Sequence, residues 1–311
     1  MSPPALIGVD WGTSSFRAAL MDPEGRVLER MTAATGILEV SGGDFEIRLR
    51  ELLGPWLDAH PGLPIVLSGM VTSRQGWLEV PYLPCPVTPE RLADALAALD
   101  LQDGQRLRFV PGLSTRRPDG LPDVMRGEET QILGALAEMP EARTLLLPGT
   151  HSKWVRVETG CVLSFSTFMT GELFALLKRQ SILGRLVEGE TWDEPGFERG
   201  VKVGLAAEGP AGASFARLFS ARSLVLAGEI GTNAVASYLS GLLIGSELRE
   251  AAALANDGDS VLLVGEPTLV ARYARALEFA GRAYALAAPD AAARGQHRLA
   301  LLAGLLEERG R

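Results

Sequence analysis

The first thirty residues alternate between short apolar runs and turns. The runs span residues 5–9, 16–22 and 26–33, and the segments between them read "DWGTSS" and "DPEG". Short apolar runs bounded by Gly, Pro, Asp and Ser are typical of β-strands, whereas amphipathic helices need longer periodic segments. The chain therefore opens with a predicted meander of strands.

The same layout returns near the middle of the chain. Residues 143–168, "RTLLLPGTHSKWVRVETGCVLSFSTF", read as three strands separated by two glycine turns. Residues 12–29 align with residues 149–164 through a shared Gly-Thr-x-Ser pattern with a basic residue nearby. A chance match of four residues is the alternative, but the shared strand–turn–strand context favours an internal duplication.

Duplication predicts an α/β protein of two domains, residues 1–142 and 143–311, with a hinge near residues 140–145. Each domain is expected to present one Gly-Thr-Ser turn. The amphipathic segment 290–310 predicts a last helix that packs back on the first domain.

The pattern predicts further elements between these segments. Strands are predicted at 63–70 and 106–114, helices at 89–99, 127–139 and 170–183, a mostly helical region at 212–254, and a strand, turn and helix over 260–281. Pro89 suits the first turn of a helix, and the acidic residues at 128 and 129 suit the helix dipole.

Composition narrows the classes of partner. The 311 residues are 47% hydrophobic, enough for a large core, and the net charge of −8 argues against nucleic-acid and anionic-membrane partners. Cys85 and Cys161 form no CxxC pattern and the three histidines are scattered, so neither a disulfide framework nor a zinc site is expected. Without a signal-peptide pattern or a membrane-length apolar segment, we expect a cytoplasmic protein with a small-molecule ligand. A homodimer is compatible with the sequence.

Phosphate binding is the chemistry that the two turns suggest. The P-loop and GxGxxG patterns are absent, but backbone N–H groups at glycine turns form anion-binding concavities. Asp10 ends an apolar run and is a candidate ligand for hydrated Mg²⁺, although it could instead cap its own turn. Lys153 is placed to neutralise charge on a transferred group. The candidate nucleotide ligands are Gly12, Thr13, Ser14, Gly149, Thr150, His151 and Ser152.

A third element follows the second turn. The apolar run at 261–264 is followed by Gly265 and Glu266 and then by a predicted helix. This arrangement allows close approach of a flat ring such as adenine, although strand–Gly–helix segments are common in proteins that bind no nucleotide.

Together these segments resemble a known superfamily. "VDWGTSSFRAAL", "LPGTHSKW" and "VLLVGEP" look like the first phosphate, second phosphate and adenosine motifs of the sugar kinase, Hsp70 and actin superfamily. The resemblance implies two duplicated ribonuclease-H-like domains that enclose ATP in a cleft, with the second domain binding the nucleotide.

Longer stretches resemble one family more narrowly. "SGMVTSRQGWLEVPYLPCP" (68–86), "PDVMRGEETQILGAL" (122–136), "STFMTGELFALL" (166–177) and "YLSGLLIGSELREA" (238–251) are similar to the 2-dehydro-3-deoxygalactonokinase family. The resemblance implies ATP- and Mg²⁺-dependent phosphorylation of 2-dehydro-3-deoxy-D-galactonate on its 6-hydroxyl, a step of galactonate breakdown. Thr72 and Gln180 stand where the family more often has Gly and His, which bears on substrate detail more than on kinase chemistry.

The general base is then sought before the second phosphate motif. Related carbohydrate kinases carry an aspartate at a helix start there, and Glu128 occupies the closest matching place. Asp123 and Glu129 are rivals. Glu128 could also serve only the helix dipole.

The acceptor's carboxylate needs a cation. Arg74 and Arg126 are the candidates, with Arg17 a weaker one. Glu172 is placed either to bind a substrate hydroxyl or to stabilise a helix start. Trp11, like Trp77, would form the floor of the sugar pocket or pack in the core.

Two alternatives stay open. One is a kinase for a different keto-deoxy sugar acid or a sugar, and the other is an actin-like nucleotide switch without an acceptor. Release of ADP that depends on an acceptor separates them.

Overall fold

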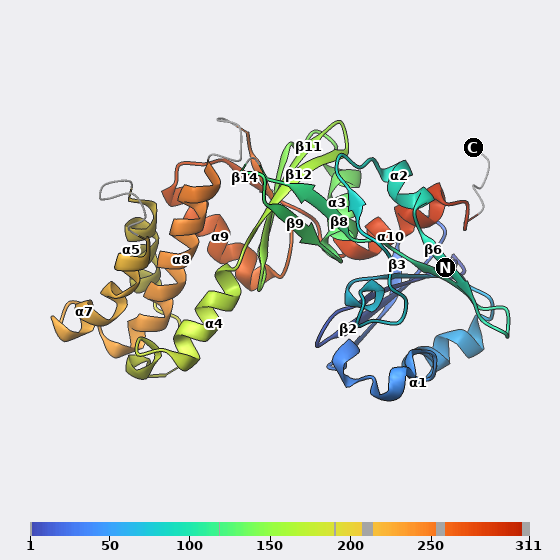
Figure 1. Cartoon of the computed structure of the whole chain (residues 1–311), viewed down its shortest axis with the longest axis horizontal. Helices are drawn as coiled ribbons and strands as arrows, with labels where there is room; N and C mark the ends of the chain where they lie inside the picture. Colours follow the sequence, from blue (N-terminus) through green and yellow to red (C-terminus); the bar gives the residue numbers. More distant parts are fainter. Residues whose placement is uncertain (1, 118, 190, 207–213, 253–258, 307–311) are drawn as a thin grey trace. The chain divides into compact units, whose positions relative to one another are not determined.

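The computed structural model describes residues 2–117, 119–189, 191–206, 214–252 and 259–306. It divides into two compact units (Figure 1). Unit 1 comprises Met1–Ala142, Val157–Phe165 and Ala287–Arg311, and unit 2 comprises Arg143–Arg156 and Ser166–Leu286.

Unit 1 is built on a six-stranded sheet in the order β3-β2-β1-β4-β7-β6. Its strands are β1 (Leu6–Trp11), β2 (Phe16–Met21), β3 (Val27–Ala33), β4 (Ile65–Ser68), β6 (Ala97–Asp100) and β7 (Arg106–Phe109). The first three form an antiparallel meander, while β1, β4 and β7 run parallel. The central strands β1 and β4 are almost entirely buried, as strands covered on both faces must be.

Helices and a small second sheet complete unit 1. The helices are α1 (Phe45–Ala59), α2 (Pro89–Asp94), α3 (Glu128–Glu138) and α10 (Ala291–Leu302), with short 3₁₀ turns at Ile37–Glu39, Ser41–Gly43 and Met70–Thr72. The small sheet has the order β5-β8-β9 and consists of β5 (Leu83–Pro84), β8 (Leu113–Arg116) and β9 (Pro122–Met125). A core of aromatic and aliphatic side chains joins α1 to the large sheet.

The last helix, α10, packs against α3 (Figure 1). Two glycines allow this close contact: a Cβ built on Gly134 would lie 1.8 Å from the Ala291 carbonyl oxygen, and one on Gly295 would lie 1.8 Å from that of Thr130. From the same helix, the Gln296 side chain donates to the Val9 carbonyl and to the Ser68 hydroxyl. Hydrogen bonds from Gln296 therefore tie helix α10 to the ends of β1 and β4.

A second sheet repeats the order of the first five strands of the unit 1 sheet, and most of its residues belong to unit 2, while Val157–Phe165 of β11 and β12 are grouped with unit 1. Its five-stranded order is β12-β11-β10-β13-β14, with β10 (Thr144–Leu147), β11 (Ser152–Glu158), β12 (Cys161–Phe168), β13 (Val261–Leu263) and β14 (Tyr284–Leu286). Strand β10 pairs antiparallel with β11 and parallel with β13, and β13 pairs parallel with β14. Strands β10 and β13 are fully buried, like their counterparts β1 and β4.

Helices fill the rest of the described part of unit 2. They are α4 (Thr170–Gln180), α5 (Glu194–Leu205), α6 (Ser214–Leu218), α7 (Ser220–Leu226), α8 (Val235–Ala251) and α9 (Pro267–Phe279), with 3₁₀ turns at Gly184–Leu186 and Thr232–Ala234. Helix α8 lies alongside α5 (Figure 1), and their backbones meet at glycines: a Cβ on Gly200 would lie 2.1 Å from the Tyr238 carbonyl oxygen.

The repeated topology confirms the predicted fold class. In each sheet the first three strands form a meander, and two further strands are added beside its first strand and run parallel to it. This is the ribonuclease-H-like arrangement. The duplication inferred from two turns thus extends to whole sheets.

Some predicted elements have different bounds. The helix expected at 89–99 ends at Asp94, and Ala97–Asp100 forms β6, because pairing with β7 at the sheet edge outweighs the helical propensity of an Ala-rich segment. The strand expected at 106–114 is split between β7 and β8, which belong to different sheets. Helix α1 and the small sheet were not predicted. Residues 212–213, 253–254 and 307–310 of the predicted helices lie outside the described residues.

The close contact between α3 and α10 predicts that a single methyl group added at Gly295 lowers the stability of the fold. Gly295→Ala should lower the free energy of unfolding by about 1–3 kcal/mol, because the added Cβ forces the two helices apart. Gly54→Ala is the matched control: this helical glycine of α1 has nothing within 4 Å of the added Cβ, and the change should stabilise by about 0.5–1 kcal/mol. Urea unfolding measures both, and equal effects would contradict the close packing.

Candidate active site

Asp10 lies near the end of β1, beside Ser68 on the parallel strand β4. Its side chain is 23% exposed, and its Oδ2 lies 3.7 Å from the guanidinium of Arg17. Burial raises the pKa of Asp10 to about 6, Arg17 opposes this shift, and the neighbouring Glu128 adds to it. Asp10 is therefore a carboxylate that gains from a nearby cation.

Two glycines bring separate segments to the Asp10 carboxylate. Gly69 follows β4 with φ +90°, and a Cβ there would lie 2.9 Å from Asp10 Oδ1. Gly127 precedes α3 with φ +106°, and its Cβ would lie 3.2 Å from the Gly69 Cα and 3.9 Å from Asp10 Oδ1. Only glycine readily adopts such a backbone in so narrow a space. The ends of β1, β4 and the start of α3 thus converge.

The three candidate bases occupy different environments. Glu128 begins α3, acts electrostatically on Asp10, and accepts a hydrogen bond from the Arg126 N–H at 3.0 Å. Glu129 is fully buried, and its Oε2 accepts the Gly127 N–H at 2.7 Å. Burial raises the pKa of Glu129 to about 8, with Glu128 adding to the shift. Asp123 lies on β9 opposite Thr115. The electrostatic effect of Glu128 on Asp10 therefore places Glu128 near this carboxylate.

The guanidinium of Arg126 is bonded to backbone and side-chain oxygens of the segment that follows β4. It donates to the carbonyl and hydroxyl of Thr72 and to the Val80 carbonyl, and it lies 4.4 Å above the Tyr82 ring. Thr72, fully buried, also donates to the Gly69 carbonyl. Arg74 is exposed in the same segment. Arg126 therefore anchors the segment from which Arg74 reaches solvent.

The first Gly-Thr-x-Ser turn joins β1 to β2. Gly12 N–H donates to the Ser15 carbonyl, and Thr13 and Ser14 are exposed. Gly36 lies against this turn, since a Cβ there would fall 1.9 Å from the Thr13 carbonyl oxygen.

Both tryptophans near this turn pack with aromatic neighbours. Trp11 is fully buried and meets Phe16 and Phe45 edge-on, and Trp77 stacks on Phe45. Trp11 therefore belongs to the core of unit 1, and Trp77 packs against that core.

The second turn, in unit 2, joins β10 to β11. The N-terminus of α4 packs on it: Glu172 N–H donates to the Thr150 carbonyl at 2.9 Å, and a Cβ on Gly171 would lie 2.4 Å from the Gly149 carbonyl oxygen. The Glu172 carboxylate pairs with His151 Nε2 at 2.5 Å. Thr150 and His151 are exposed at this turn.

The two residues after the turn point inward. Ser152 is fully buried, and its hydroxyl oxygen lies 2.9 Å from the Tyr273 hydroxyl oxygen, with which it shares a hydrogen bond. Lys153 is also buried, and its Nζ donates to the His151 carbonyl at 3.3 Å.

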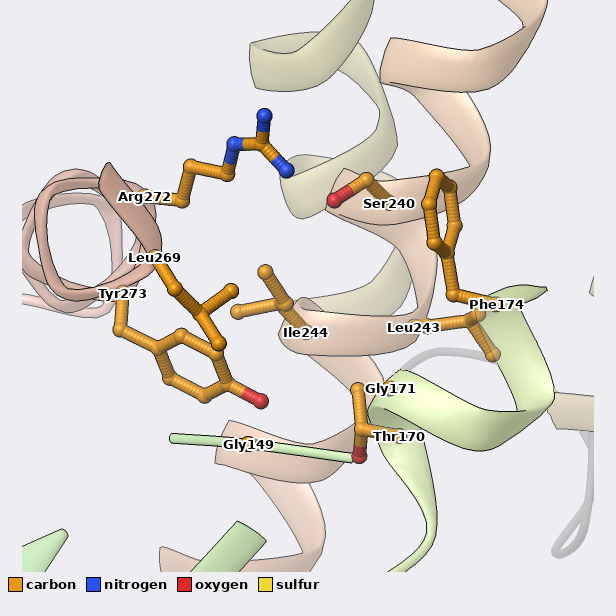
Figure 2. Close-up of a pocket in the computed structure, with 10 residues that line it drawn as sticks. All are labelled: Gly149, Thr170, Gly171, Phe174, Ser240, Leu243, Ile244, Leu269, Arg272 and Tyr273. Atoms are coloured by element: carbon orange, nitrogen blue, oxygen red, sulfur yellow. The ribbon is translucent and has the colours of Figure 1, made fainter. Parts of the chain in front are cut away.

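A pocket lies beside this turn (Figure 2). It holds about 310 Å³ of empty space and opens to solvent. Figure 2 shows Arg272 and Ser240 on one side, and the Tyr273 hydroxyl directed toward Gly149, Thr170 and Gly171 on the other. Apolar side chains of α4, α8 and α9 line the rest: Phe174, Leu243, Ile244 and Leu269.

Gly265 and Glu266 lie next to the turn rather than in the pocket lining. Gly265, with φ +153°, stands near the Pro148 carbonyl, because β10 and β13 end side by side. The Glu266 carboxylate accepts the N–H groups of Thr268 and Leu269, which lowers its pKa, and thereby caps α9.

The sequence did not reveal the polar side chains around the pocket. Arg272 and Tyr273 are on α9, Ser240 and Glu247 on α8, and each stands within an apolar helical pattern. The one available signal was Glu247, an acidic residue in the buried run of α8.

The described part of the chain shows neither a cluster of metal-ligating side chains nor a membrane-length helix. Within it, no group of three or more His, Cys, Asp or Glu side chains is arranged to hold a metal ion. None of its helices is both long and apolar enough to cross a membrane.

Comparison with known proteins decides the family. The family model described as 2-keto-3-deoxy-galactonokinase matches residues 10–299. The chain belongs to this family. It is 40% identical over 275 residues to a probable 2-dehydro-3-deoxygalactonokinase of Rhizobium meliloti, covering 88% of this chain and 89% of the relative. It is 32% identical to the 2-dehydro-3-deoxygalactonokinase of Escherichia coli, covering 88% and 90%.

A solved structure extends the likeness to the fold. The crystal structure of a 2-dehydro-3-deoxygalactonokinase protein from Sinorhizobium meliloti matches with a TM-score of 0.86 at 36% identity, covering 96% of this chain and 98% of that one. The residues of the present chain that the family model matches, 10–299, include both Gly-Thr-x-Ser turns and the pocket.

The raised pKa of Asp10 predicts that the site costs stability. Above about pH 6 Asp10 is ionised in both states, and its burial penalises only the folded one. Asp10→Asn should therefore raise Tm at pH 8 by about 1–2 °C, the shift that ~1 kcal/mol gives in a chain of 311 residues, and give little gain at pH 4.

Asp22 is the matched control for this measurement. It is also buried, but hydrogen bonds from Arg26 outweigh the effect of burial and lower its pKa, so Asp22→Asn should lower Tm at pH 8. Calorimetry at the two pH values measures both changes in Tm. A lower Tm for Asp10→Asn at pH 8 would contradict the raised pKa of Asp10.

Proposed function

We propose that this chain transfers a phosphoryl group from ATP to the 6-hydroxyl of 2-dehydro-3-deoxy-D-galactonate. The relatives that bear this activity in their names, over nearly the whole chain, support the substrate. The observation that carries the chemistry is the convergence of Asp10 and Glu128 around Gly69 and Gly127, which leaves two carboxylates at one end of the unit 1 sheet.

Glu128 is the proposed general base. It begins α3 close to Asp10, and the Arg126 N–H holds its carboxylate. Glu129 is fully buried and hydrogen-bonded to Gly127, so its role would be to fix the turn. Phosphoryl transfer depends on positioning and charge neutralisation, and Glu128 would accept the proton of the attacking hydroxyl.

The residues at Asp10 fit a magnesium ion. Mg²⁺ favours carboxylate oxygens, keeps several waters and is commonly shared with substrate phosphates. One carboxylate at the ion is therefore sufficient. When bound, Mg²⁺ would neutralise charge on the phosphates. The raised pKa of Asp10 supports the fit, because a cation favours its ionised form.

Unit 2 is proposed to bind the nucleotide. The pocket beside Gly149 offers apolar walls with Arg272 and Ser240, a composition typical of a nucleoside site. The exposed residue Thr150 and the N-terminus of α4 suit an anionic phosphate.

Arg74 is the proposed partner of the acceptor's carboxylate. It is exposed, whereas the guanidinium of Arg126 is bonded to Thr72 and Val80. Arg126 would then act indirectly, by fixing the segment that carries Arg74.

Acceptor-dependent ADP release tests the function. With ATP and Mg²⁺, the sugar acid should stimulate ADP release at least about 100-fold over no acceptor, and neutral sugars of similar size should not. Arg74→Ala should raise the KM for the sugar acid about 10- to 100-fold, since a charge-assisted pair contributes about 1.5–3 kcal/mol. Slow ADP release without any acceptor effect would instead indicate a nucleotide switch.

Two matched variants test the base. Glu128→Gln should lower kcat about 10²- to 10⁴-fold with little change in the affinity for ATP, the usual loss when a general base is removed. Asp123→Asn, on β9, should leave kcat within about threefold of the parent value. Steady-state kinetics compares them, and the reverse pattern would make Asp123 the base.

A further inference from the structure

A buried polar cluster lies behind the nucleotide turn of unit 2. We call it the Glu247 cluster, and it consists of Ser152 and Trp154 from β11, Thr170 from α4, Glu247 from α8 and Tyr273 from α9. Trp154 Nε1 donates to Glu247 Oε1 at 2.8 Å, and the Tyr273 hydroxyl donates to Glu247 Oε2 at 2.6 Å. Glu247 is 3% exposed and Tyr273 1%.

The hydrogen bonds form a connected chain. The Tyr273 hydroxyl donates to Glu247 and also shares a 2.9 Å hydrogen bond with the Ser152 hydroxyl. Thr170 also bonds Glu247. Burial raises the pKa of Glu247, and hydrogen bonds from Thr170, Tyr273 and Trp154 oppose this shift. A buried carboxyl group that is hydrogen-bonded from several elements fixes those elements relative to one another.

Each end of the cluster touches part of the proposed nucleotide site. Ser152 directly follows the 149–151 turn. Thr170 begins α4, whose next two residues pack on and hydrogen-bond that turn. Thr170 and Tyr273 also line the pocket, and Figure 2 shows the Tyr273 hydroxyl directed toward this wall. One carboxylate therefore connects the back of the turn, the start of α4 and the pocket wall.

We propose that Glu247 and Tyr273 are positioning residues that hold the 149–152 turn in register with the nucleotide pocket. The inference rests on the proposed nucleotide role of unit 2. They act through Ser152 and Thr170 and need not touch the nucleotide. Their loss would let the turn shift against the pocket, so that base and phosphates could no longer be bound together.

Tyr273→Phe tests this role by removing one oxygen atom. Tyr238→Phe is the matched control, because Tyr238 is equally buried in unit 2 but its hydroxyl bonds Ser220, outside the cluster. Both variants should lose a similar amount of thermal stability. Only Tyr273→Phe should weaken binding of a non-hydrolysable ATP analogue, by about tenfold, and raise the KM for ATP while the KM for the acceptor stays the same.

Glu247→Gln supplies the rescue, because its amide oxygen accepts from Trp154 while its N–H₂ donates to Tyr273. It should bind the analogue within about threefold of the parent chain, whereas Glu247→Ala should lose at least tenfold.

Calorimetric titration measures each dissociation constant without turnover. Equal affinities for Tyr273→Phe and Tyr238→Phe would overturn the positioning role and leave the kinase assignment intact. Failure of the parent chain to bind the analogue would contradict the ATP assignment itself, and this proposal with it.

Discussion

Parallel pairing at the centre of each sheet is the constraint on which both candidate sites depend. Parallel strands end at the same edge, so β1 and β4 deliver Asp10 and Gly69 to one place, and β10 and β13 deliver Pro148 and Gly265 to another. Ligand sites of α/β proteins commonly lie at such edges. The antiparallel meander then places a turn beside each edge, so a duplicated sheet yields two similar turns.

Buried carboxylates are the cost of this arrangement. Asp10, Glu129 and Glu247 all have raised pKa values because the fold removes water from them. The three carboxyl groups have different partners. Asp10 lies beside the guanidinium of Arg17, Glu129 accepts a hydrogen bond from a backbone N–H, and Glu247 accepts hydrogen bonds from uncharged side chains. Sites of this kind are typically less stable than apolar replacements would make them.

The sequence predicted the architecture better than the details of the site. Hydrophobic runs and turn residues are local, so the two meanders and the duplication could be read directly, and the topology followed. Strand β6 could not be predicted, because its pairing with β7 depends on a sheet edge that the sequence does not display. Helix α1 was missed although its buried positions, such as Phe45, Leu49 and Leu53, follow helical spacing.

Side-chain roles were less accessible, because residue type alone does not determine a partner. Arg126 and Arg74 read alike in the sequence, yet the structure turns the first to backbone carbonyls and leaves the second exposed. Ser152 matches a phosphate motif but points into the Glu247 cluster. Glu247 and Tyr273 interact across 26 residues, a pairing that no local pattern encodes.

The bonds of Arg126 also bear on how this chain can change. Its guanidinium reaches the carbonyl oxygens of Thr72 and Val80, and every residue type supplies a carbonyl. Neither bond depends on the side chain of Arg74, which is exposed. A loop held by its main chain can acquire a new acceptor preference through single substitutions, without first losing its position.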